Sequence, residues 1–471
     1  MVQEKVTDFK SFEEEIYRIV CRIGREAIKM ALDKWDEDIH DTRERSVYRD
    51  KGKRRTTLKT VMGEVEYWRY VYIYQDEEGR NRTEYSLDEA LGLGESGFFS
   101  EVMMERIAET ICVAPFRETA SIISNLSGQS ISHMAVWNAV QAMGKRVGQR
   151  EEADAELARK EEGCGELVSK VLFEEQDGVW ISLQGKDRKE NGKKKEMKVA
   201  IAYSGAKKTG KNRYTLTDKV ACANFESAEK FYRRKEGVIA AKYNTDEIEK
   251  RVLNADGALW PKRSAEGEDI YYQLDPYHRN QALVRAVMDP EARKTIWKLL
   301  NEGDIDGVLL CIDTLADSTP DEKESEILRK LYRYFDNNRD GLIPYYLRGL
   351  ELPEPEPGKE YRHGGAMESN VFSIIGNRMK GGRRSWSVSG GDNMARLLCL
   401  KITGRLREAS RCFASSIGER YTEEVITGLS AAKVRDHEGT GYNGCPAAAI
   451  PTSMPWLKEL TKLRSFSDLR I

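Results

Sequence analysis

Three acidic residues stand in separate stretches of the chain, and each lies in a distinctive local sequence. Asp177 lies in FEEQDGVW, Asp256 in VLNADGA and Glu368 in GGAMESN. Brought together by a fold, these three carboxylates offer only hard oxygen ligands, which suit a pair of Mg²⁺ or Mn²⁺ ions. Two such ions can clamp the attacking and leaving oxygens of an in-line phosphoryl displacement. The residue types therefore predict a two-metal site for phosphodiester chemistry.

Taken singly, each acid has a more ordinary interpretation. An Asp-Gly pair is most often a turn, and an acid in the first turn of a helix is favoured by the helix dipole. Two Asp-Gly pairs that each close an apolar strand, followed by an acid at a glycine-led helix start, favour a shared site instead. A carboxylate pair also occurs in glycoside hydrolases, where the two groups lie about 5 to 10 Å apart across a sugar cleft. Metal dependence would separate these two classes.

The composition leaves room for several cores around such a site. The 471 residues are 40% hydrophobic, which predicts roughly three units of about 100 to 200 residues. Because 76 basic and 78 acidic side chains nearly cancel, contact with nucleic acid must come from local patches. The eight cysteines are scattered without a CxxC pair, and no signal peptide or long apolar run is present. We expect a soluble cytoplasmic protein that has reduced thiols, does not bind membranes and associates with the nucleoid.

The N-terminal quarter combines an amphipathic helix with a basic hairpin. Apolar residues recur at helical spacing over residues 9–35. A basic run over residues 43–59 leads into a hairpin over residues 57–74 with Gly63 at its turn. A basic run beside aromatic strands suits a DNA-facing surface, although a merely solvated face is an equal alternative. The candidate DNA contacts here are Arg49, Lys53, Arg54 and Arg55.

Residues 98–165 are expected to be helical and to bind DNA. Short helices are predicted over residues 101–111, 116–126 and 133–147, with a glycine turn and the N-cap Ser132 before the last. This pattern favours a helix-turn-helix whose recognition helix is 133–147, against the alternative of an ordinary helical hairpin. A charged helix over residues 150–162 is interpreted as a linker. The candidate DNA contacts are His133, Trp137 and Asn138.

From Val168 the periodicity changes to that of strands. Strands are predicted over residues 168–183, 196–203, 214–223, 251–255 and 270–274, with helices over 226–242 and 276–288. This order matches an α/β ribonuclease H-like core with a mixed five-stranded sheet. In that fold the first acid lies within the first strand, the second ends the fourth strand and the third stands on a late helix. An all-helical insertion over residues 290–360 then precedes the final helix, which is predicted over residues 368–379.

Taken together, these fragments resemble the transposases of the ISLre insertion-sequence family, which is related to the Mutator-like DDE transposases. The resemblance covers most of the chain, and the order and spacing of its fragments are more specific than any one of them. The matching text is, in chain order, VMGEV from Val61, LDEALGL from Leu87, SHMAVWN from Ser132, DGV from Asp177, NADGA from Asn254, QLDPYH from Gln273, AMESN from Ala366, and Trp386.

The resemblance implies a site and a reaction. Asp177, Asp256 and Glu368 would be the metal-binding triad for two divalent cations, Mg²⁺ or Mn²⁺, while Asp275 and His278 would form an Asp-x-x-His motif that shapes the active site. Gln176 is a departure, because a small residue is expected there. The implied activity is DNA cleavage and strand transfer at the element ends, in an assembly that is at least a homodimer on double-stranded DNA. The alternative from another class is a DNA-binding protein whose transposase-derived nuclease core is inactive.

A basic cluster with a tryptophan follows the third acid. Cations can neutralise phosphates and an indole can stack on an unpaired base, so the cluster suits a DNA end near the metals. A solvated basic face with a partly buried tryptophan is the alternative. The cluster comprises Arg378, Lys380, Arg383, Arg384 and Trp386. The expected domain order is 1–97, 98–165, a core in two parts (166–289 and 361–411) around the insertion 290–360, and a tail 412–471.

Overall fold

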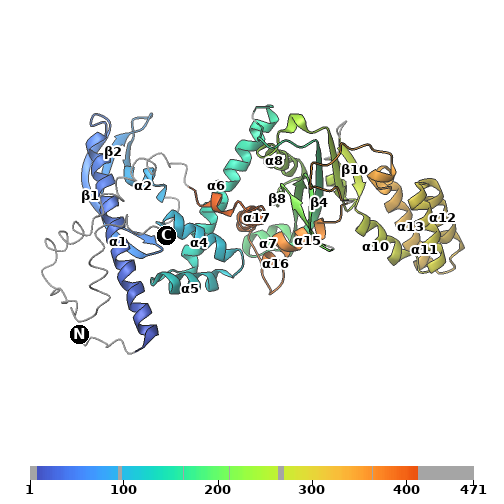
Figure 1. Ribbon diagram of the computed structural model, residues 1–471, viewed down its shortest axis with the longest axis horizontal. Coiled ribbons are helices and arrows are strands. Elements are labelled where there is room, and N and C mark those ends of the chain that lie inside the picture. Colours follow the sequence, from blue (N-terminus) through green and yellow to red (C-terminus); the bar gives the residue numbers. More distant parts are fainter. Residues whose placement is uncertain are drawn as a thin grey trace. The chain divides into compact units, whose positions relative to one another are not determined.

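The computed structural model describes residues 8–93, 98–162, 164–211, 213–263, 270–362 and 364–411. Figure 1 shows the course of the chain. The chain divides into two compact units. Residues up to Met104 and Ala120–Ala135 belong to the first, while Glu105–Thr119 and Val136–Ser410 form the second. The expected tail 412–471 lies outside the described residues.

The first unit packs one long helix on a small antiparallel sheet. Helix α1 (Phe9–Thr42) begins at the N-cap Asp8, whose Oδ1 accepts a hydrogen bond from Ser11 N at 2.8 Å. The sheet contains β1 (Arg49–Thr60), β2 (Gly63–Gln75) and β3 (Asn81–Glu84), and α2 (Ser86–Ala90) follows. The predicted hairpin is present, with Gly63 at a φ of +112° beside its turn. Its core includes Leu32, Leu58, Val65 and Tyr67.

The three helices predicted from Glu101 onward are present, but the third is longer than expected. They are α4 (Glu101–Ile111), α5 (Phe116–Ser127) and α6 (His133–Arg159). The predicted recognition and linker helices are thus one helix of 27 residues. Gly148 does not end it, because this glycine serves close packing within the second unit: a Cβ there would lie 2.7 Å from the Arg396 guanidinium carbon.

The second unit contains a five-stranded mixed sheet with the order β10-β9-β4-β5-β8. Strand β4 pairs antiparallel with β5, and β5 pairs antiparallel with β8. On its other side β4 pairs parallel with β9, which pairs parallel with β10. The strands are β4 (Val171–Ser182), β5 (Lys194–Tyr203), β8 (Val220–Asn224), β9 (Lys250–Ala255) and β10 (Ile270–Leu274). A mixed α/β unit with five strands therefore matches the expected sheet.

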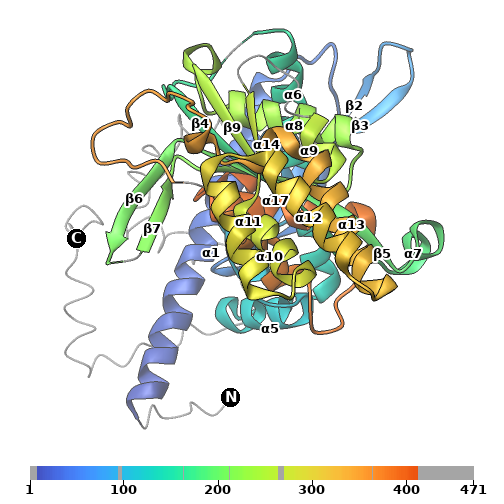
Figure 2. The same cartoon turned by 90° about the vertical axis from the view of Figure 1, so that its right-hand side faces the viewer.

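One predicted strand, 214–223, was wrong because it is broken in two. Asp218 adopts a φ of +58°, a left-handed conformation that extended strands do not use. Before it, β7 (Arg213–Thr217) pairs with β6 (Gly205–Gly210) in a separate hairpin, and only β8 after it joins the sheet. The basic turn between β4 and β5 contains the short helix α7 (Gly185–Asn191). In Figure 2 this helix and the β6–β7 hairpin project from opposite sides.

The predicted helical insertion is present and shares a core with the helix before it. Leu283 of α10 is buried in one cluster with Ile296, Val308, Ile312 and Phe335. The helices are α10 (Pro276–Ala286), α11 (Pro290–Glu302), α12 (Ile305–Ser318), α13 (Glu322–Asn337) and α14 (Arg339–Leu342).

The final predicted helix is present, with a π-turn at its centre. It comprises α15 (Met367–Val371), the π-helical segment Phe372–Gly376 and α16 (Asn377–Met379). Such π-turns inside α-helices are frequent at functional sites. The remaining elements are α8 (Ala228–Ala240), α9 (Leu259–Arg263), α17 (Val388–Ile402) and 3₁₀ turns at Thr245–Glu247, Tyr345–Leu347 and Leu406–Ala409. Within the described ranges, no helix is both long and apolar enough to cross a membrane.

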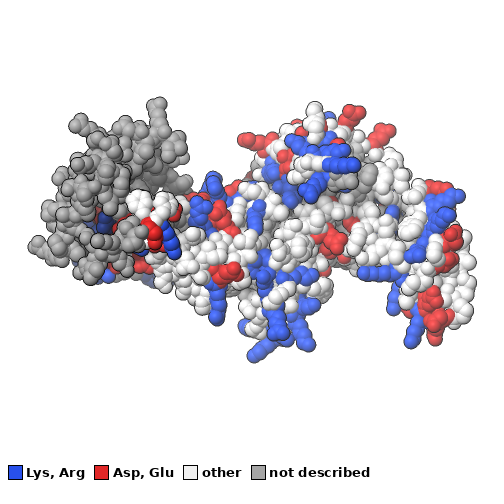
Figure 3. Space-filling model, turned by 60° about the horizontal axis from the view of Figure 1, so that its bottom comes forward, with Lys and Arg blue, Asp and Glu red and all other residues white. Residues whose placement is uncertain are grey.

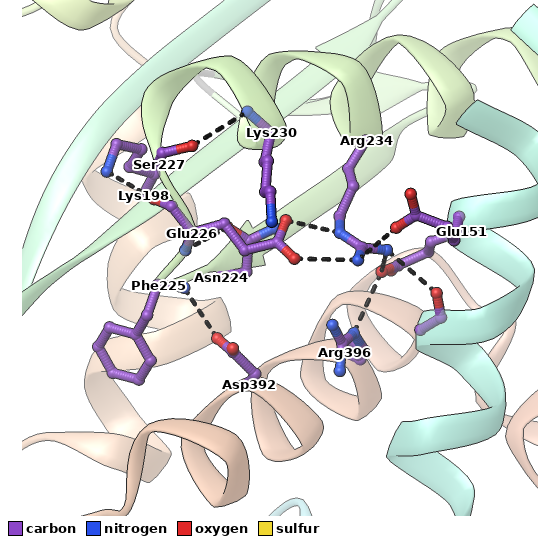
Figure 4. A network of polar contacts seen from close by, with 12 residues as sticks. Glu151, Lys198, Asn224, Phe225, Glu226, Ser227, Lys230, Arg234, Asp392 and Arg396 are labelled. Atoms are coloured by element: carbon purple, nitrogen blue, oxygen red, sulfur yellow. Dashed lines mark hydrogen bonds and ion pairs between the residues drawn. The ribbon is translucent and has the colours of Figure 1, made fainter. Parts of the chain in front are cut away.

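A charge network joins α6, α8 and α17 (Figure 4). Glu151 of α6 lies 3.2 Å from Arg396 of α17 and 3.9 Å from Arg234 of α8. Asp392 of α17 accepts a hydrogen bond from the backbone N of Phe225 at 2.8 Å, and burial raises the pKa of its carboxyl to about 6. The network fixes these helices to the sheet.

Candidate active site

The strand register aligns three aspartates at one edge of the sheet. Gln176 of β4 pairs with Ala255 of β9, and Ala255 pairs with Leu274 of β10. Asp177, Asp256 and Asp275 are the residues that follow these three. Because the three strands run parallel, the aspartates occupy equivalent positions on neighbouring strands. The fold thus brings together two of the three predicted triad acids and the Asp-x-x-His aspartate.

The electrostatics agree with close approach of the first two acids. Burial raises the pKa of Asp177, and the negative charge of Asp256 raises it further. Each side chain also accepts a local backbone hydrogen bond, Asp177 from Gly178 N at 2.7 Å and Asp256 from Ala258 N at 2.9 Å. Two carboxylates that repel each other on adjacent strands form a suitable seat for a divalent cation, because the cation removes the repulsion.

Asp275 and His278 form a second polar pair at this edge. Asp275 caps α10 by accepting from Tyr277 N at 2.7 Å and His278 N at 3.1 Å. Burial acts to raise the pKa of Asp275, but hydrogen bonds from His278 and Asn254 outweigh burial and lower it. His278 Nδ1 lies 3.5 Å from Asp275 Oδ1, an ion-pair distance. The pKa of His278 is raised chiefly by Asp275 and further by Asp177 and Asp256, which favours an imidazolium facing the acids.

A buried polar row lies one step further inside the sheet. Three of its members stand two residues before the three aspartates: Glu175, Asn254 and Gln273. The fourth is Tyr203 on the neighbouring strand β5. Asn254 Nδ2 donates to Glu175 Oε2 at 3.2 Å and to Asp275 Oδ2 at 2.7 Å. Tyr203 OH donates to Glu175 Oε1 at 2.7 Å, and Gln273 Nε2 donates to Asn254 Oδ1 at 3.2 Å. Sequence reasoning missed this row, although polar residues two positions before each acid in otherwise apolar strands are a readable signal.

Glu175 also ties the third acidic segment to the sheet. Its carboxylate accepts hydrogen bonds from the backbone N of Met367 at 2.9 Å and of Ala366 at 3.3 Å. The first turn of α15, which carries Glu368, is therefore held against β4 close to Asp177.

The side chain of Glu368 does not complete a ligand set. It is exposed, and the part of the chain that the structure describes contains no group of three His, Cys, Asp or Glu side chains that could hold a metal ion. Asp177 and Asp256 thus stand at equivalent positions on adjacent strands, while Glu368 is exposed on a separate element, α15.

Two glycines with positive φ lie in tightly packed places near this edge of the sheet. Gly257 has a φ of +94°, and a Cβ there would lie 2.9 Å from Tyr334 of α13 and from Asn338, which follows that helix. Tyr334 OH donates to the backbone O of Asp256 at 2.7 Å, so the helical insertion supports the second acid directly. Gly364 has a φ of +87° and lies over Asn254, with 3.1 Å to a Cβ.

Two members of the predicted basic cluster are buried rather than available to DNA. Arg378 Nε donates to the backbone O of Ile111 at 2.6 Å, and burial lowers the pKa of its guanidinium to about 10. Trp386 is 4% exposed, and its Nε1 donates to Met379 O at 3.1 Å. The proposed stacking of Trp386 on a base is therefore incompatible with this packing.

The other members of the cluster lie at the surface. Lys380 and Arg383 are exposed. Arg384 is half-buried and donates to the backbone O of Asn377 at 2.9 Å and of Arg378 at 3.1 Å. This arginine therefore caps the end of α16, while its two neighbours are free to meet a ligand.

Of the three predicted recognition-helix residues, two are exposed and one packs against other side chains. His133 and Asn138 are exposed. Trp137 packs with Phe116, with ring centroids 5.3 Å apart, and a Cβ on Gly390 would lie 2.4 Å from its ring. Trp137 therefore contributes to packing within the second unit.

In the basic hairpin, Arg49 and Arg54 are exposed. Arg55 lies 3.3 Å from Glu66, and Lys53 lies 4.5 Å from the centroid of the Tyr70 ring. Arg49 and Arg54 are thus the better candidates for phosphate contact.

Comparisons with known proteins find one family. The sequence profile of the uncharacterised protein family UPF0236 matches residues 2–414. A UPF0236 protein of Caldanaerobacter subterraneus subsp. tengcongensis is 27% identical over 400 residues, which cover 83% of this chain and 78% of that protein. The name of this relative joins eleven designations from one genome. A UPF0236 protein in the vanSb 3′ region of Streptococcus gallolyticus is 25% identical over 384 residues, 79% of this chain and 80% of that protein.

Proposed function

The chain belongs to the uncharacterised protein family UPF0236, and from this premise we propose that it is a DNA transposase of the ISLre type. It would cut and join DNA strands at the ends of its own mobile element with the help of divalent metal ions. The observation that carries the proposal is the register that puts Asp177 and Asp256 at equivalent positions on adjacent parallel strands. Both side chains are half-buried, and two mutually repelling carboxylates side by side at a sheet edge reduce stability, as is common for acids retained for function.

The order of the elements supports a ribonuclease H-like interpretation of the core. Strands β4, β5 and β8 come first, then helix α8, then β9, with the β6–β7 hairpin inserted before β8. The first acid lies within the first strand, the second follows the fourth and the third stands on a late helix. These are the places expected for the acids of such a core.

The relatives support a mobile element. One of them carries eleven designations in a single genome, another four and a third two. Several copies in one genome are the expected result of a gene that moves with its own enzyme. A housekeeping enzyme has no comparable reason to be repeated in this way.

The side chains would have separate roles in this reaction. Asp177 and Asp256 would hold the metal, with Glu368 as the third ligand supplied from α15. Bound divalent ions would activate the attacking oxygen and neutralise charge on the leaving one. His278, with its raised pKa, would keep a positive charge beside the aspartates and attract a DNA phosphate.

Recognition of the element ends would rest on exposed cations of the first unit, Arg49 and Arg54, and on α6. Cutting two ends requires at least two copies of the chain on the DNA, so we propose a homodimer or larger assembly.

A second candidate is a DNA-binding protein with an inactive core derived from a transposase. It is favoured by the exposed side chain of Glu368 and by the absence of a three-ligand group among the described residues. Under this alternative the protein binds the same DNA without cutting it.

The test is strand cleavage and joining by purified protein on labelled duplexes that carry the DNA flanking its gene, with Mg²⁺, Mn²⁺ or chelator. We expect metal-dependent products that disappear in Asp177→Asn, Asp256→Asn and Glu368→Gln. Glu322→Gln is the matched control, because Glu322 is also an exposed acid in the first turn of a helix, α13. Binding without cleavage under every condition would support the second candidate, and no binding at all would reject both.

A further inference from the structure

Two basic segments far apart in the sequence meet on one face of the second unit. The first is α7 with the turn after it, and the second is the loop after α16. Figure 3 shows lysine and arginine side chains gathered on the lower middle of the face drawn there. The exposed members are Lys186, Arg188, Lys189, Lys193 and Lys194 from the first segment and Lys380 and Arg383 from the second. We call this set the α7 surface.

Backbone hydrogen bonds hold the two segments together. Gln184 N donates to Trp386 O at 2.9 Å, and Trp386 N donates to Ser182 O at 3.0 Å. Val388 N donates to Asp187 Oδ2 at 2.8 Å. The second segment therefore runs alongside the end of β4 and the start of α7, and the cations of both segments belong to one rigid surface.

The loop is built to present its cations outward. Gly381, Gly382 and Arg383 have φ values of +75°, +52° and +57°. Arg383 is not a glycine, so its left-handed conformation costs about 1 kcal/mol and needs support from its surroundings. Arg384 supplies that support by bonding the carbonyl of Asn377 at the base of the loop. The backbone that carries these cations is therefore anchored at its base.

The positive charge is largely unneutralised. Among the described residues, Lys189, Lys193, Lys194, Lys380 and Arg383 have no acidic partner within ion-pair distance. Of the nearby acids, Asp187 is engaged with the backbone of the second segment, and Glu190 pairs with Lys186 at 3.5 Å. Although the chain as a whole has a net charge of −2, this surface has a strong local positive potential.

Strand β4 and the final helix each connect one of the acids to the α7 surface, and their lengths give the distance between the acids and that surface. From Asp177 to Ser182 strand β4 advances five residues, or about 17 Å. From Glu368 to Met379 the final helix advances eleven residues, or about 17 Å. Both routes lead from an acid to the same surface. A B-form duplex rises about 3.4 Å per base pair, so 17 Å corresponds to about five base pairs.

We propose that the α7 surface binds the sugar-phosphate backbone of duplex DNA about five base pairs from the phosphate positioned at Asp177 and Asp256. The inference rests on the proposed function for the location of the reacting phosphate. The contacts are to phosphates and are independent of base sequence, because lysine and arginine side chains on an exposed turn offer no groove-reading element. The surface would hold the flanking or target duplex in line with the site.

The test measures binding of a fluorescein-labelled 30-base-pair duplex by anisotropy, in chelator so that no strand is cut, over a range of NaCl concentrations. In Lys189→Glu/Lys194→Glu we expect the dissociation constant to rise at least about tenfold at 0.1 M salt. We also expect the slope of log K against log salt to fall by about two, since each lost phosphate contact removes about 0.9.

The matched control is Lys207→Glu/Lys208→Glu. These lysines are also exposed, but they lie on strand β6 of the β6–β7 hairpin, which is on the opposite side in Figure 2. Equal weakening in both double variants would overturn the proposal, because net charge alone would then explain the effect. The proposal would also be overturned if Lys189→Glu/Lys194→Glu bound the duplex as tightly as the wild type, with the same slope of log K against log salt. That result would not contradict the proposed function. A wild-type protein that binds no duplex would reject both.

Discussion

Replacing Glu175 by glutamine should lower the stability of the second unit. Glu175 is 1% exposed. One carboxylate oxygen accepts from Tyr203 OH and Ala366 N, and the other accepts from Asn254 Nδ2 and Met367 N. In Glu175→Gln one oxygen becomes an NH₂ group, so whichever way the amide turns, two of the four donors lose the oxygen that accepted their hydrogen bonds.

The size of the effect follows from this count. A hydrogen bond to a charged group contributes about 1.5 to 3 kcal/mol, so losing two costs about 3 to 6 kcal/mol. Burial raises the pKa of Glu175, which means that ionising the carboxyl is unfavourable, and the neutral amide recovers part of the loss. We expect a net loss of about 2 to 4 kcal/mol, or a fall in Tm of about 5 to 10 °C for a unit of this size.

The neighbouring residue provides the control. Gln176 is also 1% exposed, but neither polar atom of its side chain has a hydrogen-bond partner within the described structure. Gln176→Leu should therefore leave the stability unchanged or raise it by about 1 kcal/mol. Urea denaturation followed by tryptophan fluorescence measures both variants, since Trp386 is buried in the same unit. A Glu175→Gln midpoint equal to the wild type, or an equal loss in Gln176→Leu, would refute the reasoning.

Three further predictions concern packing and charge in the second unit. Gly257→Ala should lower the free energy of unfolding by about 1 to 3 kcal/mol, because of the positive φ and the contact with Tyr334. It should also weaken Mn²⁺ binding measured by electron paramagnetic resonance. Unchanged binding would show that this loop does not position Asp256. Gly144→Ala should lower the free energy of unfolding by a similar amount, because a Cβ there would lie 2.3 Å from the Cβ of Asn393. An unchanged thermal midpoint would contradict this close contact between α6 and α17. The pKa of Asp392 is raised to about 6, so the stability that its protonated form contributes is present at pH 4 and is lost as the pH rises through 6. Asp392→Asn should therefore raise the free energy of unfolding by about 1 to 3 kcal/mol at pH 7.5 and by little at pH 4. An equal effect at both pH values would count against this assignment.

Local sequence was sufficient for most of the elements. The helix beginning at His133, the hairpin with Gly63 and the strands around Asp177 and Asp256 follow from periodicity, caps and turn residues, which act over a few positions. Where the prediction was wrong, the deciding contact came from far away. Arg396 packs against Gly148 and lets α6 continue as one helix, and the left-handed Asp218 separates the β6–β7 hairpin from the sheet.

The sequence by itself determined which side chains are available for chemistry: three acids in distinct motifs, an Asp-x-x-His pair and two basic runs. Only the tertiary structure decided which of them meet. The register of parallel strands aligns Asp177 with Asp256, and Glu175 joins α15 to the same strand. Register and burial depend on contacts between segments far apart in the sequence, such as Glu175 and Met367, which no local pattern encodes. For the same reason Trp386, which the sequence offered as a base-stacking residue, is buried in the core.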